Sequence, residues 1–221
     1  MTGPGASDSH EERAKALDRL AERILADLAP LSFEIAGSPE ERDDVLRMRY
    51  GCMLELGWVT PGDYRDGRVS DEDDERATFV VCRDGDDLVG SMRVVPPVPD
   101  RPLPTEREFG IRVRPAGAIF EAGRMVVPRR HRAGRSHRIV AGFCARSWVE
   151  GRAFACNRVI SAVAPDVMEL YRGLGMRIVV LGPPREYWGE ERAPVEITVR
   201  EAQPAAVDRD TRLTAALEEP G

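Results

Sequence analysis

The run IFEAGRMVV, residues 119–127, constrains the fold most, because it combines the pattern of a strand with two charges. Glu121 and Arg124 lie three residues apart, so a regular strand would point them to opposite faces of its sheet. Burying either charge without a partner is costly. The chain must therefore supply partners inside the fold, or a bulge must turn both side chains toward one site.

The length and composition are those of a globular protein with one large domain or two small ones. The chain has 221 residues, of which 42% are hydrophobic and 32% charged. Its net charge of -6 argues against general affinity for nucleic acid. No apolar run is long enough to span a bilayer, and the first residues lack the pattern of a signal peptide. We expect a cytoplasmic location.

The cysteines do not form a metal-binding pattern. Cys52, Cys82, Cys144 and Cys156 are scattered, no two have C-x-x-C spacing, and no histidines accompany them at ligand distances. We expect reduced thiols that are mostly buried, and we expect neither a metal site nor a permanently bound cofactor.

The first third of the chain predicts two helices. Residues 1–9 are expected to be a disordered tail, and apolar residues at helical spacing predict an amphipathic helix over 10–28. The motif SPEE at 38–41 has the pattern of a capping box that opens a helix over 39–56. The Gly- and Asp-rich segment 60–75 is expected to be a mobile loop.

The rest of the chain alternates strands and helices. Strands are expected at 31–37, 77–83, 88–95, 118–127, 157–164, 176–182 and 194–201, and helices at 134–151 and 165–175. Five prolines within 96–104 mark a long excursion. The order predicts an α+β domain with a mixed sheet over 31–200, preceded by an N-terminal helical segment, 10–30, and followed by a tail, 201–221.

A basic segment, PRRHRAGRSHR, follows the charged strand. Gly134 provides a turn, and a helix is expected to start near Ser136, where free backbone N–H groups and the helix dipole favour anions. The arginines of this segment are Arg129, Arg130, Arg132, Arg135 and Arg138. The pattern is that of a pyrophosphate cradle, and the alternative is a solvated basic surface that includes His131 and His137.

The second half of the chain resembles the GNAT-type N-acyltransferases. Their phosphate loop reads Q/R-x-x-G-x-G/A, and residues 131–136 read HRAGRS. His131 replaces the usual Gln or Arg, and Ser136 replaces the small residue, where a serine could cap the helix. A later helix in the family ends in L-Y-x-x-x-G-F, and residues 170–176 read LYRGLGM.

The first half resembles the long-chain branch of the same superfamily, which includes acyl-homoserine-lactone synthases and N-acyl amino acid synthases. That branch shares an Arg-aromatic helix, an Asp-rich loop, a G-x-x-R strand and an E-x-x-R strand. The matching residues are Arg49 with Tyr50, Trp58, Asp71 to Asp74, Gly90 with Arg93, and Glu121 with Arg124. The resemblance covers roughly 32–200 and implies a GNAT-like domain. The recognisable glycine loop favours the N-acyl amino acid synthases.

Acyl transfer to an amine requires a base, because an amine attacks a thioester only when it is neutral. Glu121 could be this base, directly or through water, since burial raises the pKa of a carboxyl group. The resemblance implies that Tyr171 protonates the leaving thiolate. The alternatives are a structural ion pair between Glu121 or Arg124 and Arg93 or Asp74, and a packing role for Tyr171.

The other candidates divide into a donor side and an acceptor side. The donor's pantetheine and phosphates are expected at Met125, Val126, Val127, Arg129, Arg132, Ala133, Gly134, Arg135 and Ser136, with a backbone N–H near Met125 to Val127 as an oxyanion donor. The acceptor is expected at Arg49, Trp58, Asp71, Asp74, Arg93 and Arg124, because arginine binds carboxylates and aspartate binds ammonium groups. The alternatives are a solvated acidic loop and a packing role for Trp58.

These features predict an N-acyltransferase that moves a medium- or long-chain acyl group from an acyl-CoA or acyl-carrier-protein thioester to an amino acid or related amine. An arginine-rich entrance would suit an acidic carrier protein as partner. The alternatives are a non-catalytic module that binds acyl thioesters and a lactone synthase that uses S-adenosylmethionine. The acyl length, the acceptor (a free amino acid, a polyamine or a peptide side chain) and the oligomeric state are left open.

Overall fold

The computed structural model describes residues 5–132 and 135–199. The helices are α1 (Gly5–Asp27), α2 (Pro39–Glu55), α3 (Pro104–Phe109), α4 (Ser136–Ala153) and α5 (Pro165–Gly173), with 3-10 turns η1 (Ala116–Ala118) and η2 (Arg129–His131). The strands are β1 (Leu31–Ile35), β2 (Thr78–Asp84), β3 (Asp87–Val95), β4 (Ile119–Val126), β5 (Arg158–Val163), β6 (Met176–Val180), β7 (Arg185–Tyr187) and β8 (Glu190–Val199).

The strands form one mixed sheet in the order β1-β2-β3-β4-β5-β8-β6, and β7 pairs with β8. Neighbours pair antiparallel except β4 and β5, which run parallel. The expected α+β fold with a mixed sheet is therefore confirmed. The sheet also places β4, the strand with the two charges, at its centre.

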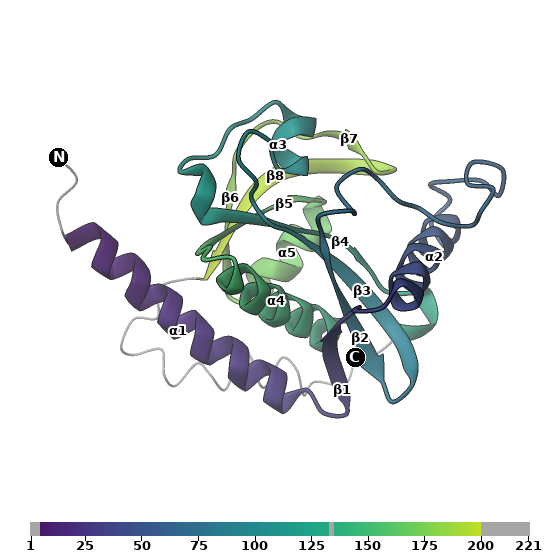
Figure 1. Ribbon diagram of the computed structural model, residues 1–221, viewed down its shortest axis with the longest axis horizontal. Helices are drawn as coiled ribbons and strands as arrows, with labels where there is room; N and C mark the ends of the chain where they lie inside the picture. Colours follow the sequence, from purple (N-terminus) through teal and green to yellow (C-terminus); the bar gives the residue numbers. More distant parts are fainter. Residues whose placement is uncertain (1–4, 133–134, 200–221) are drawn as a thin grey trace.

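Helices cover both faces of this sheet (Figure 1). Helix α4 packs on one face, with α1 lying along it, and α2 lies on the other face. The α4 face buries Phe33, Met92 and Phe143, and the α2 face buries Val45 and Phe79 with other apolar residues. The buried charges described below lie on the α2 face.

The start of α2 agrees with the sequence prediction, whereas the start of α1 does not. Ser38 accepts a hydrogen bond from the Glu41 N–H at 3.1 Å, and the Glu41 carboxylate accepts one from the Ser38 N–H at 3.1 Å, so the capping box that opens α2 is confirmed. Helix α1 begins at Gly5, so residues 5–9, expected in a disordered tail, are helical. Residues 1–4 and the tail 201–221 lie outside the described residues.

A bulge interrupts β4 at the charged motif. Ser91 pairs with Val126 and Arg93 pairs with Gly123, so Arg124 and Met125 of β4 oppose a single residue of β3. Arg124 has a φ of 54°, the left-handed conformation found at one type of bulge. The extra residue shifts the alternation of side chains. Arg124 therefore turns to the Glu121 side, which resolves the conflict between the two charges.

The parallel strands β4 and β5 pair over a short stretch only. The described pairs are Ile119 with Arg158, Phe120 with Val159, and Glu121 with Ile160. Beyond these pairs β4 runs on to Val126 with no described pairing to β5, whereas β5 continues to Val163 and pairs with β8 along its other edge. The two strands thus separate immediately after Glu121, and the backbone of β4 from Ala122 onward is unpaired on that edge.

The proline-rich excursion between β3 and β4 contains a helix that the sequence pattern did not predict, α3. The buried carboxylate of Glu106 accepts hydrogen bonds from the N–H groups of Leu103 at 3.0 Å and Val113 at 2.8 Å. These two bonds fix the excursion in one conformation on the α2 face of the sheet.

Candidate active site

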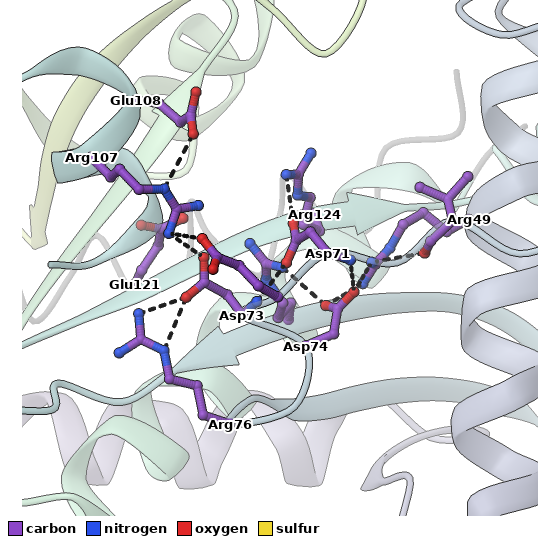
Figure 2. Close-up of polar contacts among 12 residues, drawn as sticks. Arg49, Asp71, Asp73, Asp74, Arg76, Arg107, Glu108, Glu121 and Arg124 are labelled. Atoms are coloured by element: carbon purple, nitrogen blue, oxygen red, sulfur yellow. Dashed lines mark hydrogen bonds and ion pairs between the residues drawn. The ribbon is translucent and has the colours of Figure 1, made fainter. Parts of the chain in front are cut away.

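Five charged residues predicted for the acceptor side form one continuous chain of ion pairs on the α2 face (Figure 2). Arg49 of α2 binds Asp74 at 2.8 Å, and Asp74 binds Arg93 of β3 at 3.0 Å. Arg93 also binds Asp71 at 2.6 Å, and Asp71 binds Arg124 of β4 at 2.8 Å. Charges from two strands, one helix and one loop therefore meet at a single place.

Four of the five side chains in the chain of ion pairs are almost entirely removed from solvent, and that of Asp71 is 24% exposed. The side chains of Arg49 and Arg93 are each 1% exposed, and those of Asp74 and Arg124 are each 8% exposed. Burial raises the pKa of Asp71, but Arg93 and Arg124 outweigh burial and hold that pKa below its ordinary value. Burial lowers the pKa of Arg124 to about 9, which leaves the guanidinium charged at neutral pH.

The loop that carries the aspartates is more ordered than the sequence suggested. Asp73 is fully buried, and its carboxylate binds Arg76 at 2.7 Å and Arg107 at 2.9 Å. Asp71 and Asp74 face the sheet as described above. The expectation of a mobile loop over 60–75 is therefore wrong for its second half, because three aspartates there are held by arginines from other elements.

Arg124 is enclosed by the hairpin of β7 and β8. Its guanidinium donates to the Tyr187 hydroxyl at 3.2 Å and lies against the ring of Trp188. Trp188 has a φ of 57°, so two non-glycine residues in the left-handed region are in contact here. Such strained residues gather at functional sites. No pattern in the sequence indicated that Tyr187 and Trp188 belong to the site, since an aromatic pair in a hairpin more often packs in the core.

Glu121 lies on the same face, beneath α3. Its side chain is buried, with 5% of the residue exposed, and its Oε2 accepts a hydrogen bond from the Thr105 N–H at 2.6 Å. Burial raises the pKa of Glu121, although Arg93, the Thr105 contacts and Arg124 oppose the rise. No donor among the described residues binds its other oxygen, Oε1.

Two buried arginine donors near Glu121 also lack partners. Arg93 Nη2 and Arg124 Nη1 are removed from solvent and make no hydrogen bond with any described residue. Buried polar groups are normally satisfied, so unpaired donors beside an unpaired acceptor indicate a place for a further polar group.

Trp58 and Tyr171 are joined to the chain of ion pairs by no described hydrogen bond or ion pair. Trp58 packs against Gly189 at the β7–β8 turn, where any side chain would overlap its ring, and Arg192 lies 5.4 Å from its ring centroid. Tyr171 belongs to an apolar cluster with Met168 and Val195, and burial raises its pKa. Met125 of β4 packs against this same cluster. The structure thus gives both aromatic residues a packing environment.

The donor-side candidates follow one another at the end of β4 and the start of α4. Met125 and Val126 end β4, and the Val127 carbonyl accepts a hydrogen bond from Arg132 Nε at 2.8 Å. Arg129 lies in η2, where its N–H donates to Glu55 at 2.9 Å, and Arg135 precedes α4 and binds Asp84. Ala133 and Gly134 lie outside the described residues.

The start of α4 differs from the expected cap. Arg135 is the N-cap residue and no side chain caps the helix. The Ser136 hydroxyl instead donates to the Arg132 carbonyl. The expectation that Ser136 caps this helix is therefore wrong, and the helix start keeps N–H groups without a side-chain cap, as an anion site requires.

The described residues hold no cluster of histidine, cysteine, aspartate or glutamate that could bind a metal ion. Within the same residues, no helix combines the length and apolar character needed to cross a membrane. All four cysteines are free thiols, and three of them are buried. Burial raises the pKa of Cys52 to about 11, so this thiol is a poor nucleophile at neutral pH.

A family model decides the relationship. The model of the N-acyl amino acid synthase FeeM matches residues 44–198, which include every residue of the ion-pair chain and Glu121. The chain belongs to this family. The resemblance found in the sequence is thereby confirmed, and the protein is assigned to an acyltransferase family that is related in fold to the acyl-homoserine-lactone synthases. A search of curated proteins finds no match.

Solved structures show the same fold for this FeeM-family chain. FeeM, an N-acyl amino acid synthase from uncultured soil microbes, has a TM-score of 0.60 at 16% identity, over 77% of this chain and 92% of FeeM. BjaI, a CoA-dependent acyl-homoserine lactone synthase solved with SAM and isopentyl-CoA, has a TM-score of 0.62 at 19% identity, over 86% of this chain and 90% of BjaI. TofI, solved with an inhibitor and MTA, has a TM-score of 0.60 at 16% identity, over 80% of this chain and 96% of TofI. The GNAT-like fold expected from the sequence is confirmed.

Proposed function

We propose that this protein is an N-acyltransferase that moves an acyl group from a coenzyme A or acyl-carrier-protein thioester to the amine of an amino acid or a related acceptor. One observation carries the proposal. A buried glutamate with a raised pKa and one free oxygen lies where two parallel strands separate, beside arginine donors that lack partners. Membership of the FeeM family supports the same chemistry.

The donor thioester is proposed to lie along the unpaired edge of β4. Its pantetheine arm carries amide groups, and the backbone of β4 between Ala122 and Val126 has no described strand pairing on the β5 side. The diphosphate or phosphate of the donor would meet the uncapped start of α4 and the exposed Arg129 and Arg130. The thioester carbonyl then lies near the bulge, where the Met125 N–H is a candidate oxyanion donor.

The acceptor is proposed to bind between Glu121 and the ion-pair chain. An acidic group on the acceptor would pair with the free donors of Arg93 and Arg124, and its amine would meet Glu121 Oε1. The nitrogen attacks the thioester carbon, the carbon–sulfur bond breaks, and the nitrogen's proton passes to Glu121. The sulfur leaves as a thiol, protonated by Tyr171 or by water. A side-chain nucleophile is unnecessary in this direct transfer.

The test is release of free thiol from acyl-CoA and acyl-carrier-protein thioesters when a panel of amines is added. The panel holds free amino acids, polyamines and peptides, and mass spectrometry identifies the product. We expect amino-acid-dependent thiol release and a product heavier than the acceptor by one acyl group. Failure of every thioester with every amine would refute the proposal, and a thioester that binds without turnover would identify a binding module instead.

A lactone synthase is the second candidate, because BjaI, a CoA-dependent acyl-homoserine lactone synthase, shares the fold. Adding S-adenosylmethionine as the amine distinguishes the two activities. A lactone product together with methylthioadenosine would favour this candidate, whereas an open-chain amide from an amino acid favours the first.

A further inference from the structure

Thr105 contacts Glu121 with two groups. Its backbone N–H donates to Glu121 Oε2, and its side chain is fully buried. The Thr105 hydroxyl makes no hydrogen bond with any described residue. It lies close enough to the Glu121 carboxylate to favour the ionised form. Buried hydroxyl groups are normally satisfied, and the Glu121 carboxylate is the acceptor beside this one.

The helix that carries Thr105 is held firmly in place. Glu106 fixes the start of α3 and the chain beyond it through the N–H groups of Leu103 and Val113. Arg107 joins α3 to Asp73 at 2.9 Å (Figure 2), and Asp73 lies between Asp71 and Asp74 in the sequence. The contacts of Glu106 and Arg107 therefore hold α3, and with it Thr105, in place beside Glu121.

We infer that Thr105 is a positioning residue for Glu121, whose N–H fixes Oε2 and whose hydroxyl stabilises the ionised carboxylate, leaving Oε1 to receive the proton of the acceptor amine. This inference rests on the proposed function for the role of Glu121. The proton moves from the nitrogen to Oε1, and no bond to Thr105 forms or breaks. A carboxylate held by two donors keeps its orientation when it gains or loses a proton.

Two substitutions separate the hydroxyl from the rest of the residue. Thr105→Val keeps the shape and the backbone N–H but removes the hydroxyl, and Thr105→Ser restores it. On the acidic limb of the pH profile, we expect kcat/KM to fall about tenfold in Thr105→Val, the loss typical of a hydrogen bond to a charged group. The Thr105→Ser enzyme should stay within about threefold of the parent. A loss in Thr105→Val that is equal at every pH, or no loss, would overturn the inference.

Infrared titration of the carboxyl groups provides a readout that needs no turnover. The difference between the parent and Glu121→Gln isolates the Glu121 signal, and the same difference is then taken in the Thr105→Val and Thr105→Ser backgrounds. We expect the midpoint of Glu121 protonation to move to higher pH in the valine variant only. An unchanged midpoint would refute the role of Thr105 even in an active enzyme. An inactive parent would instead count against the proposed function.

Discussion

At the scale of single residues, the site is explained by how Glu121 and Arg124 are brought to one face. Regular alternation would separate them, and the left-handed conformation of Arg124 at the bulge prevents this. Arg124 then ends the chain of ion pairs with one donor left free. A guanidinium can bind an acceptor carboxylate with two parallel hydrogen bonds, which an ammonium group cannot reproduce.

Arg124→Lys tests this use of the guanidinium. The substitution keeps the charge but loses the planar fork, so we expect the KM of the amine acceptor to rise about tenfold. The KM of the thioester should stay within about twofold, because the contacts proposed for the donor are with the β4 backbone and the start of α4, not with the Arg124 side chain. Steady-state kinetics with each substrate varied in turn measure both values.

Arg112→Lys is the matched control, since Arg112 is exposed and its one described bond is to the neighbouring Ile111 carbonyl. It should leave both KM values unchanged. Equal rises of the two KM values in Arg124→Lys would contradict an acceptor-specific role for Arg124.

At the scale of elements, the sequence predicted what depends on local signals. The capping box of α2 and the start of α4 near Ser136 were placed correctly because caps and periodicity are local. Helix α3 was missed because six residues among prolines show no period, and Glu106 caps it from inside. The order of the aspartate loop was missed because most of its arginine partners come from distant elements.

Two glycines of α4 illustrate such a long-range constraint. A methyl group at Gly142 would overlap the Phe33 ring, and one at Gly151 would overlap the Phe120 ring. We expect Gly142→Ala to lower the free energy of unfolding by about 1–3 kcal/mol, although alanine usually stabilises helices. Denaturant unfolding measures the change.

Gly173→Ala is the control for this prediction, because the α5 position has open space around it. It should leave the stability unchanged or raise it by up to about 1 kcal/mol. Gly142→Ala behaving like Gly173→Ala would show that α4 does not approach β1 as closely as described.

At the scale of the whole molecule, buried charges tie the two halves of the chain together. Asp71 and Asp73, from the first half, have pKa values below their ordinary value of 3.8 despite burial, because arginines hold them. A lowered pKa in the folded state adds stability above pH 3.8, and that stability is lost as the pH falls through the folded pKa. Glu121 changes the stability in the opposite direction as the pH falls, because its pKa is raised in the folded state.

We therefore expect the free energy of unfolding to fall steeply below about pH 4. Asp73→Asn should destabilise the protein at neutral pH and make the acid loss shallower, since one linked group is gone. Asp86→Asn, at an exposed position in the β2–β3 turn, should reproduce the parent curve. Denaturant unfolding at a series of pH values measures these curves. Parallel curves for the parent and Asp73→Asn would contradict the linkage.

The central claim is that the buried Glu121 takes the proton of the acceptor amine, and the kcat/KM of Glu121→Gln tests it most directly. Glu34→Gln, an exposed glutamate on β1, is the control and should match the parent. We expect Glu121→Gln to fold and to bind the thioester, with kcat/KM lowered by about 100-fold or more. A Glu121→Gln enzyme within about threefold of the parent across the pH range would contradict the account.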